Sequence, residues 1–244
     1  MAKLSQNRLA IEAICLLLSV SGLWSGAVRA EVVQLYNGAV YGIQNSASQV
    51  GMNSGNNFSW AQSFTNAVGP VQLTSVTAYL SKADGTNPTG DFRISLFRAT
   101  HAGGLATPTG AALYSTGNIS VAGLGLTTLA AQKDFFFTGT GTWDLDATVS
   151  DYMLVFDGSL LTGSNYFYLQ DSTTYVSGQN LAYQQNSGSW SGVAGQPPPT
   201  SAMVIYANTV PEPGALLLMF VAQVAGLMVW RFRRKRKSPG HCTV

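Results

Sequence analysis

The stretch Asp91-Phe92-Arg93-Ile94-Ser95-Leu96 alternates polar and apolar side chains with a period of two. Successive side chains of a strand point to opposite faces of a sheet, so this period is typical of a strand with one buried and one wet face. The same period recurs through residues 31–209, where no ten-residue segment has the period of an amphipathic helix. It predicts strands at 32–36, 58–64, 71–80, 92–96, 113–115, 134–137, 143–145, 152–156, 165–169, 180–184 and 202–207.

Clusters of turn-forming residues separate the predicted strands. They lie at 82–91, 101–104, 107–110 and 187–192, and glycine, proline, Asn, Asp and Ser favour turns there. The proline run at 197–199 cannot lie in a central strand, so it predicts a surface loop. About ten short strands with frequent turns predict an all-β fold, an antiparallel two-sheet sandwich of jelly-roll-like type.

The C-terminal end has a different composition. An uncharged apolar run of seventeen residues, 214–230, precedes six basic residues, Arg231, Arg233, Arg234, Lys235, Arg236 and Lys237. As a helix the run would be about 25 Å long, near the short limit for crossing a hydrocarbon core of about 30 Å. By the positive-inside rule the basic residues stay in the cytoplasm and everything before Pro211 lies outside. The run therefore predicts a short transmembrane helix.

The N-terminal end predicts a secretory signal helix. Lys3 and Arg8 precede an apolar stretch at 11–24, and the segment 27–30 offers small residues where a signal peptidase reads. An uncleaved anchor is the alternative, and the short apolar stretch argues against it. The predicted organisation is a signal peptide at 1–30, an extracytoplasmic domain at 31–209 and a membrane-targeting segment at 210–244.

The predicted domain is acidic although the whole chain is basic. Its four Lys and Arg against nine Asp and Glu give a formal charge of −5. An acidic domain gives no electrostatic basis for binding nucleic acid. Cys15 and Cys242 both lie outside it, so we expect a domain held by its core without a disulfide bond.

The C-terminal segment resembles a bacterial sorting signal. The motif 210–214, Val-Pro-Glu-Pro-Gly, the apolar run and the basic cluster stand in the order of the PEP-CTERM signal of Gram-negative bacteria that make exopolysaccharide. The resemblance implies an exosortase, an integral-membrane cysteine enzyme, as a partner that cuts near Pro211, Glu212 and Pro213. It also implies a precursor held transiently in the inner membrane, whose domain then passes to the cell surface or the extracellular biofilm matrix. Residues 238–244 make this tail longer than most of its class.

The domain resembles a second family over roughly residues 58–206. The segments 61–65, 73–76 and 90–97 and the late Trp190 are similar to the choice-of-anchor R domain, which appears with different C-terminal anchoring signals. The resemblance implies a surface β-domain and no established activity.

The residues that hydrolytic or zinc chemistry needs are sparse in this domain. Its single histidine, His101, lies in a predicted Gly-rich loop, which favours a solvated side chain. The segment 188–192 has the glycine frame of a nucleophile elbow, but Trp190 stands at its centre and predicts a hairpin tip or loop. Zinc would need clustered Cys and His. Carboxyls for glycosidase chemistry are available, but the sequence does not pair any two of them: Asp144, Asp146, Asp157 and Asp171. We expect no catalysis and no cofactor.

Two binding hypotheses stay open. Asp84, Asn87 and Asp91 share one loop and offer the oxygen ligands that Ca²⁺ prefers, the alternative being that they only form turns. Tyr166 and Tyr168 share a strand face, and together with Trp190 they lie among Gln, Asn and Ser residues. Aromatic rings stack on sugar rings, and neighbouring amides form hydrogen bonds with sugars. These three residues therefore predict a carbohydrate contact, with core packing as the alternative.

Together these observations predict an exported, non-catalytic surface or matrix protein delivered by its C-terminal signal. A module that binds carbohydrate, such as exopolysaccharide, is the alternative function. A membrane-anchored protein that is never cut is the alternative account of the tail.

Overall fold

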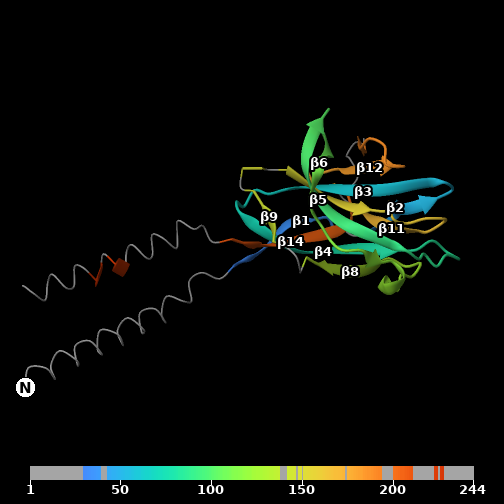
Figure 1. Cartoon of the computed structure of the whole chain (residues 1–244), viewed down its shortest axis with the longest axis horizontal. Coiled ribbons are helices and arrows are strands. Elements are labelled where there is room, and N and C mark those ends of the chain that lie inside the picture. Colours follow the sequence, from blue (N-terminus) through green and yellow to red (C-terminus); the bar gives the residue numbers. More distant parts are fainter. Residues whose placement is uncertain are drawn as a thin grey trace, which may run out of the picture. The chain divides into compact units, whose positions relative to one another are not determined.

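The computed structural model describes residues 30–39, 43–137, 142–146, 148–149, 151–173, 175–193, 200–210, 223–224 and 226–227. Residues Val32–Thr209 form one compact unit, and its regular structure in the described ranges is almost entirely β (Figure 1). The predicted all-β class is thus confirmed. The predicted signal helix and most of the predicted transmembrane helix lie outside the described residues.

Fourteen strands and one turn of 3-10 helix make up the described domain. They are β1 (Val32–Asn37), β2 (Ile43–Asn53), β3 (Asn56–Thr65), β4 (Val71–Ser81), β5 (Asp91–Ala102), β6 (Leu105–Ser115), β7 (Ile119–Ser120), η2 (Ala122–Leu124), β8 (Ala131–Phe136), β9 (Trp143–Leu145), β10 (Asp151–Asp157), β11 (Tyr166–Ser172), β12 (Leu181–Gln185), β13 (Ser191–Gly192) and β14 (Met203–Thr209).

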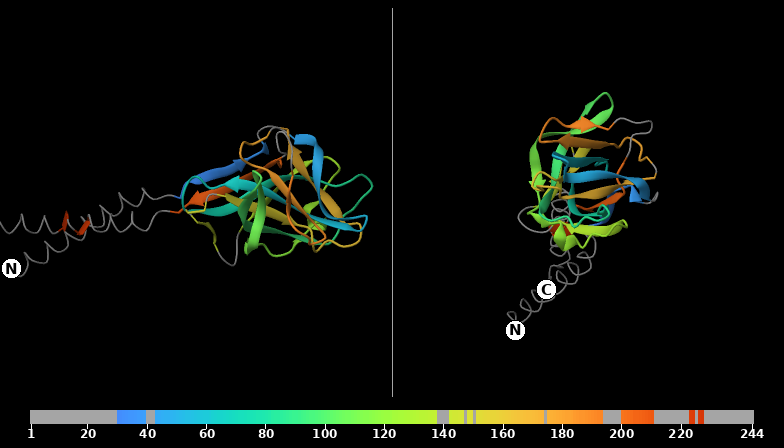
Figure 2. Two further views of the ribbon diagram at one scale, coloured as in Figure 1. Left: turned by 90° about the horizontal axis from the view of Figure 1, so that it is seen from above. Right: turned by 90° about the vertical axis from the view of Figure 1, so that its right-hand side faces the viewer.

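All the strands belong to one antiparallel network that curls on itself (Figure 2). Its main path is β1-β14-β4-β11-β2-β3-β10-β5-β6, with β8 and β9 paired to β4, β12 to β3, β13 to β12, and β7 to β5. The predicted antiparallel sandwich-like arrangement is confirmed, but its two sheets are joined into one. One half of the path is β1-β14-β4-β11-β2 and the other is β3-β10-β5-β6, and the two halves face each other across the core. A short ladder between β2 and β3, residues 51–53 against 56–58, joins the halves into one sheet.

The junction depends on how β3 shares its edges. Phe58 pairs with Gly51 of β2 on one edge and with Gln185 of β12 on the other. Two residues on, Trp60 pairs with Phe156 of β10 and again with β12. Because β12 keeps one edge throughout, β2 and β10 must follow each other along the opposite edge. The sheet divides where β10 replaces β2.

Glycines allow the chain to pass through this junction. A Cβ atom on Gly158, directly after β10, would lie 2.5 Å from both the backbone nitrogen of Gly51 and the backbone oxygen of Phe58. Gly51 has φ = +106°, and its own Cβ would lie 2.5 Å from the backbone oxygen of Asn165. Neither position can hold a larger residue unless the backbone moves.

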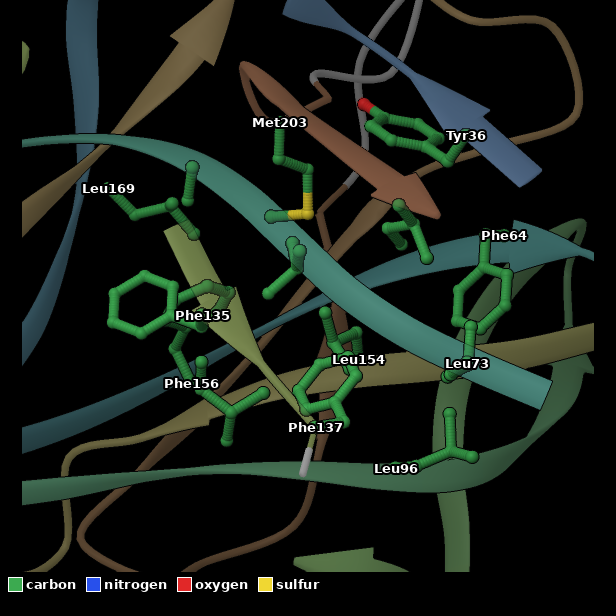
Figure 3. Packing of buried hydrophobic residues seen from close by; sticks show 14 of the residues in the cluster. Tyr36, Phe64, Leu73, Leu96, Phe135, Phe137, Leu154, Phe156, Leu169 and Met203 are labelled. Atoms are coloured by element: carbon green, nitrogen blue, oxygen red, sulfur yellow. The ribbon is translucent and has the colours of Figure 1, made fainter. Parts of the chain in front are cut away.

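The main core fills the inside of the curl. Side chains from both halves meet there, and Figure 3 shows Phe135 and Phe137, at the end of β8, near Leu154 and Phe156 of β10. The rings of Phe135 and Phe156 have centroids 6.2 Å apart in an edge-to-face contact. These contacts between strands far apart in sequence replace the disulfide bonds that the domain lacks.

The alternation of buried and exposed residues in strand β4 changes part-way along the strand. Val71 and Leu73 are buried before the change, and Val76, Ala78 and Leu80 are buried after it. The register between β4 and β14 shifts by one residue at the same place, between Ser75 and Leu73. Such a bulge changes which side chains point into the core. It also lets β9 pair with the first part of β4 and β8 with the second.

A second, smaller core covers the outer face of β10. Met153 and Val155 point away from the main core and pack with Ala61, Ala106 and Ala182. The Asn180 side chain stabilises this layer as a substitute for backbone pairing: its Oδ1 accepts the N–H of Ala106 at 2.8 Å, and its Nδ2 donates to the carbonyl of Ala106 at 3.0 Å. Strand β10 is consequently buried on both faces.

One predicted turn is wrong. Residues 107–110 lie within β6, where Pro108 pairs with Ala99 of β5. Counting from the Ala102 and Leu105 pair that closes the hairpin, position 108 falls in a non-hydrogen-bonded pair, which needs no N–H directed at β5. Proline is tolerated in an edge strand for this reason.

Gly158→Ala is expected to lower the free energy of unfolding by about 2–3 kcal/mol, because the added methyl group overlaps two backbone atoms of the junction. Urea unfolding of the purified protein measures the change. Gly117→Ala is the matched control, since its Cβ meets nothing within 4 Å. Equal stability of the two variants would show that the junction is not tightly packed.

Candidate functional site

Two tyrosines form an aromatic pair on the outer face of β11. Tyr166 and Tyr168 alternate with buried Phe167 and Leu169, and both are half-buried. Their ring centroids are 5.6 Å apart with the rings edge to face. Burial, followed by the hydrogen bond that the Tyr168 hydroxyl donates to Tyr166, raises the pKa of the Tyr168 phenol, which stays neutral around physiological pH.

Amide side chains lie next to this pair, as the sequence predicts from the Gln and Asn residues around it. Gln49 of β2 stands opposite Tyr168 in the register, and Oε1 of Gln49 accepts a hydrogen bond from Asn53 at 3.1 Å. Its Nε2 is buried and has no hydrogen-bond partner among the described atoms. On the other side of β11, Nε2 of Gln170 donates to the hydroxyl of Ser81 at 2.7 Å. The pair thus lies beside an amide donor that has capacity to spare.

Trp190 lies apart from the tyrosine pair in its contacts. It packs, half-buried, on the outer core cluster of Ala61, Met153 and Ala182. It belongs to the hairpin between β12 and β13, whose register pairs Ala182 with Gly192. The prediction of a hairpin tip or loop is correct for residues 188–190, whereas Ser191 and Gly192 form β13. Of the three residues predicted to contact carbohydrate, the described contacts bring together two.

The predicted calcium ligands each bond elsewhere. Asp84 accepts the N–H of Gly85 at 2.9 Å in a turn, and Asn87 accepts the Lys82 ammonium at 2.6 Å. Asp91 accepts a long bond of 3.4 Å from Asn118. Within the described part of the chain, no three His, Cys, Asp or Glu side chains could hold one metal ion.

The other carboxylates are dispersed as well. Asp144 bonds Gln72 and Thr142, Asp146 lies 3.9 Å from Arg98, and Asp171 accepts the hydroxyl of Ser48. Hydrogen bonds from the backbone and hydroxyl of Thr148 hold the pKa of Asp146 below its usual value. Their described bonds therefore involve no second carboxylate.

Asp157 forms the shortest described ion pair, 2.9 Å from Arg93. Burial alone would raise the pKa of this carboxyl. The hydroxyl and N–H of Ser159, together with the charge of Arg93, outweigh burial and lower the pKa below its ordinary value. Asp157 is thus ionised and tied to β5.

His101 lies at the end of β5 rather than in a loop. Its Nε2 is 3.4 Å from Oδ2 of Asp151, and its side chain is 44% exposed. The other oxygen of Asp151 accepts the hydroxyl of Thr65. His101 therefore faces a carboxylate and solvent. Its described contacts include no hydroxyl group that it could activate as a nucleophile.

The predicted processing residues lie beyond the described domain. Pro211, Glu212, Pro213 and the basic cluster fall outside the described residues. Of the predicted membrane span, the structure describes only Gln223, Val224, Gly226 and Leu227, all in helical conformation. Among the residues that the structure describes, none of the helices reaches the length and apolarity that a membrane crossing requires.

Comparison with known protein families identifies one segment. Residues 209–235 match the family model described as the PEP-CTERM protein-sorting motif. The tail carries a PEP-CTERM sorting motif. Neither a curated protein nor a solved structure matches the chain. The motif implies export, a membrane-anchored precursor and processing by an exosortase, whereas the choice-of-anchor R resemblance of the domain stays a prediction.

Sequence reasoning missed Gln49, because its strand β2 carries a mostly polar sequence, IQNSASQVGMN, without clear alternation. The only available signal was the pairing of a polar strand with the tyrosine strand, which depends on the tertiary fold.

Asp157→Asn is expected to lower the free energy of unfolding by about 1–2 kcal/mol near pH 7, a value limited by the partial exposure of Arg93. The stability that the carboxylate contributes is present above the unfolded Asp pKa of about 3.9 and is lost as the pH falls through the lower folded pKa. The difference between wild type and variant should therefore shrink below about pH 4. Urea unfolding at several pH values tests this. Asp84→Asn, which keeps its turn acceptor and breaks no described ion pair, is the control and should be as stable as wild type near pH 7. A difference for Asp157→Asn that does not change with pH would contradict the assignment.

Proposed function

We propose that this protein is an exported, non-enzymatic β-domain that an exosortase releases from the inner membrane and passes to the cell surface or extracellular matrix of a Gram-negative bacterium. The proposed recognition element is Pro211, Glu212 and Pro213. Proline disfavours a helix at the residue before it, so this segment extends readily into a processing site. The apolar run and the basic cluster would hold the element at the outer rim of the bilayer.

The position of the motif relative to the fold carries this proposal. The matched segment begins at Thr209, which is also the last residue of β14. Strand β14 is paired on both edges, with β1 and with β4. A cut near 211–213 therefore leaves every described strand of the domain in place.

The non-enzymatic part of the proposal is supported by the dispersed carboxylates. Asp157 pairs with Arg93, Asp146 lies near Arg98, and Asp171 bonds Ser48. Glycosidase chemistry would instead need two opposed carboxyls, one of them kept protonated.

Replacing the motif tests the processing step. In the native host, Glu212→Ala is expected to leave the C-terminal tail on the chain and to retain the precursor in the inner membrane. Wild type should end at or before Pro213 when its mature C-terminus is measured by mass spectrometry. Ser238→Ala, outside the matched segment, is the control and should be processed normally. A mature wild-type chain that still carries Arg231 to Lys237 would refute exosortase release and support a permanently anchored protein.

A carbohydrate-binding role is the second candidate, and the surroundings of Tyr168 favour it. Tyr166 and Tyr168 present half-buried rings, and Gln49 across the register has a buried amide nitrogen without a partner. A rotation of the Gln49 side chain would bring this nitrogen to the surface, where a sugar hydroxyl accepting from it would satisfy a donor that otherwise costs free energy. Stacking of the sugar on the rings would supply the remaining affinity.

Gln49→Met separates binding from stability. The variant removes a buried donor that lacks a partner, and the acceptor that it also removes served the partly exposed Asn53 amide, which water can satisfy instead. Its free energy of unfolding should therefore stay within about 0.5 kcal/mol of wild type or rise. Retention in affinity gels containing neutral polysaccharide should fall about tenfold, the loss of one satisfied hydrogen bond from a buried donor. The double variant Tyr166→Ala/Tyr168→Ala should abolish retention, and Tyr168→Phe should keep most of it. Unretarded migration of wild type in every polysaccharide gel would exclude this role.

A further inference from the structure

The curl of the sheet leaves a groove of about 500 Å³ along one side. One lip is formed by the end of β8, with Asp134 and Phe136 among the lining residues. The other is formed by the segment around Thr116 and Asn118, between β6 and β7. The floor is apolar and includes Phe137 and Trp143, which stack at 4.1 Å. The volume is in the range of sites that bind ligands.

The groove lip on β8 is the free edge of a strand. Among the described strands, β8 pairs only with β4. Antiparallel neighbours alternate between hydrogen-bonded and non-hydrogen-bonded pairs, and the bond from the N–H of Phe137 to Thr74 fixes which residues face β4. Residues 133, 135 and 137 direct their backbone groups toward β4. The N–H and C=O groups of Gln132, Asp134 and Phe136 consequently point away from β4, and Asp134 and Phe136 line the groove.

The character of both lips restricts what could fill the groove. Asp134 stands on one lip, and Asn118 on the other bonds the carboxylate of Asp91. The surrounding domain is acidic as well. These charges favour an occupant with basic side chains and disfavour an anionic one.

The aromatic floor argues against a sugar. Trp143 stacks with both Phe137 and Tyr114, at ring-centroid distances of 4.1 and 5.8 Å, and it is 6% exposed. Its indole ring therefore offers almost no exposed surface on which a pyranose could stack. The regular spacing of backbone donors and acceptors along β8 matches instead an extended polypeptide.

A second copy of the chain fits the groove poorly. In a symmetric pairing of two β8 edges centred on Asp134, that carboxylate would stand opposite its own copy, and opposed like charges destabilise a sheet. The inward residues of the second β8, Phe135 and Phe137, are already buried in their own core, so they could not fill the groove of the first.

We propose that the free edge of β8 is a strand-acceptor site for an extended segment of another protein, with apolar residues at alternate positions and Lys or Arg at the positions between. The partner adds a strand beside Asp134 and Phe136. Its apolar side chains point into the groove over Phe137 and Trp143, and its basic side chains face solvent near Asp134. The added strand pairs the backbone groups that the curl leaves at this edge.

The test uses an alternating lysine–valine heptapeptide and the purified full-length protein. Calorimetry should detect saturable binding, and hydrogen exchange should show new protection at the amides of Asp134 and Phe136. Phe136→Pro deletes an N–H that faces the groove and leaves the bonds to β4 intact, so it should weaken binding about tenfold, as expected for a lost hydrogen bond. Phe136→Ala, which keeps the N–H, is the matched control and should bind within about threefold of wild type.

A second probe keeps the test independent of the folding of the proline variant. The same peptide with N-methyl groups on alternate amides cannot donate to β8 and should not bind wild type. The proposal is overturned if the N-methylated peptide binds as well as the parent. It is also overturned if neutral oligosaccharides, and not the peptide, protect the amides of β8. Sedimentation showing a dimer that Phe136→Pro dissociates would assign the edge to self-pairing, which likewise overturns it.

Discussion

The handover between β2 and β10 along one edge of β3 is the constraint on which the rest of the fold depends. Because Gly51 and Gly158 let three backbone segments approach within contact distance, β3 can belong to both halves of the sheet. The halves then face each other and enclose the main core. The same curl leaves β8 with β4 as its one partner among the described strands. The main core, the position of the tyrosine strand β11 and the groove therefore all depend on this one junction. Each of them requires that the two halves of the sheet are connected to each other.

Much of the strand content could be predicted from alternation, and the places where prediction failed have physical causes. Phe92, Ile94 and Leu96 bury one face of β5, as their spacing indicates. Strand β2 carries polar residues on both faces and is positioned by its partner β11, so its own sequence gives no period. The division of β3 between β2 and β10 depends on contacts about one hundred residues apart. No local pattern encodes such a contact, and two separate sheets were the simpler expectation.

The candidate site also contains residues that the sequence could place and one that it could not. Tyr166 and Tyr168 could be placed on one face because strand periodicity alone decides it. Trp190 could not, since a second hydrophobic layer over Met153 and Val155 covers the outer face of β10. That layer exists because β10 is the middle strand of its half, and a single sequence shows burial on both faces only as a continuous apolar run. The sorting motif needs no tertiary information, because its parts are adjacent in sequence.

Processing and folding are compatible because of how the first and last strands meet. Val32 at the start of β1 pairs with Asn208 near the end of β14. The predicted signal cleavage after Ala30 and the proposed cut near Pro213 therefore both fall just outside the same end of one ladder. Removing residues beyond either point deletes no backbone pair of that ladder, while β4 holds the other edge of β14. A domain without disulfide bonds can thus lose both terminal segments and keep its full set of strand pairings, which a protein processed at both ends requires.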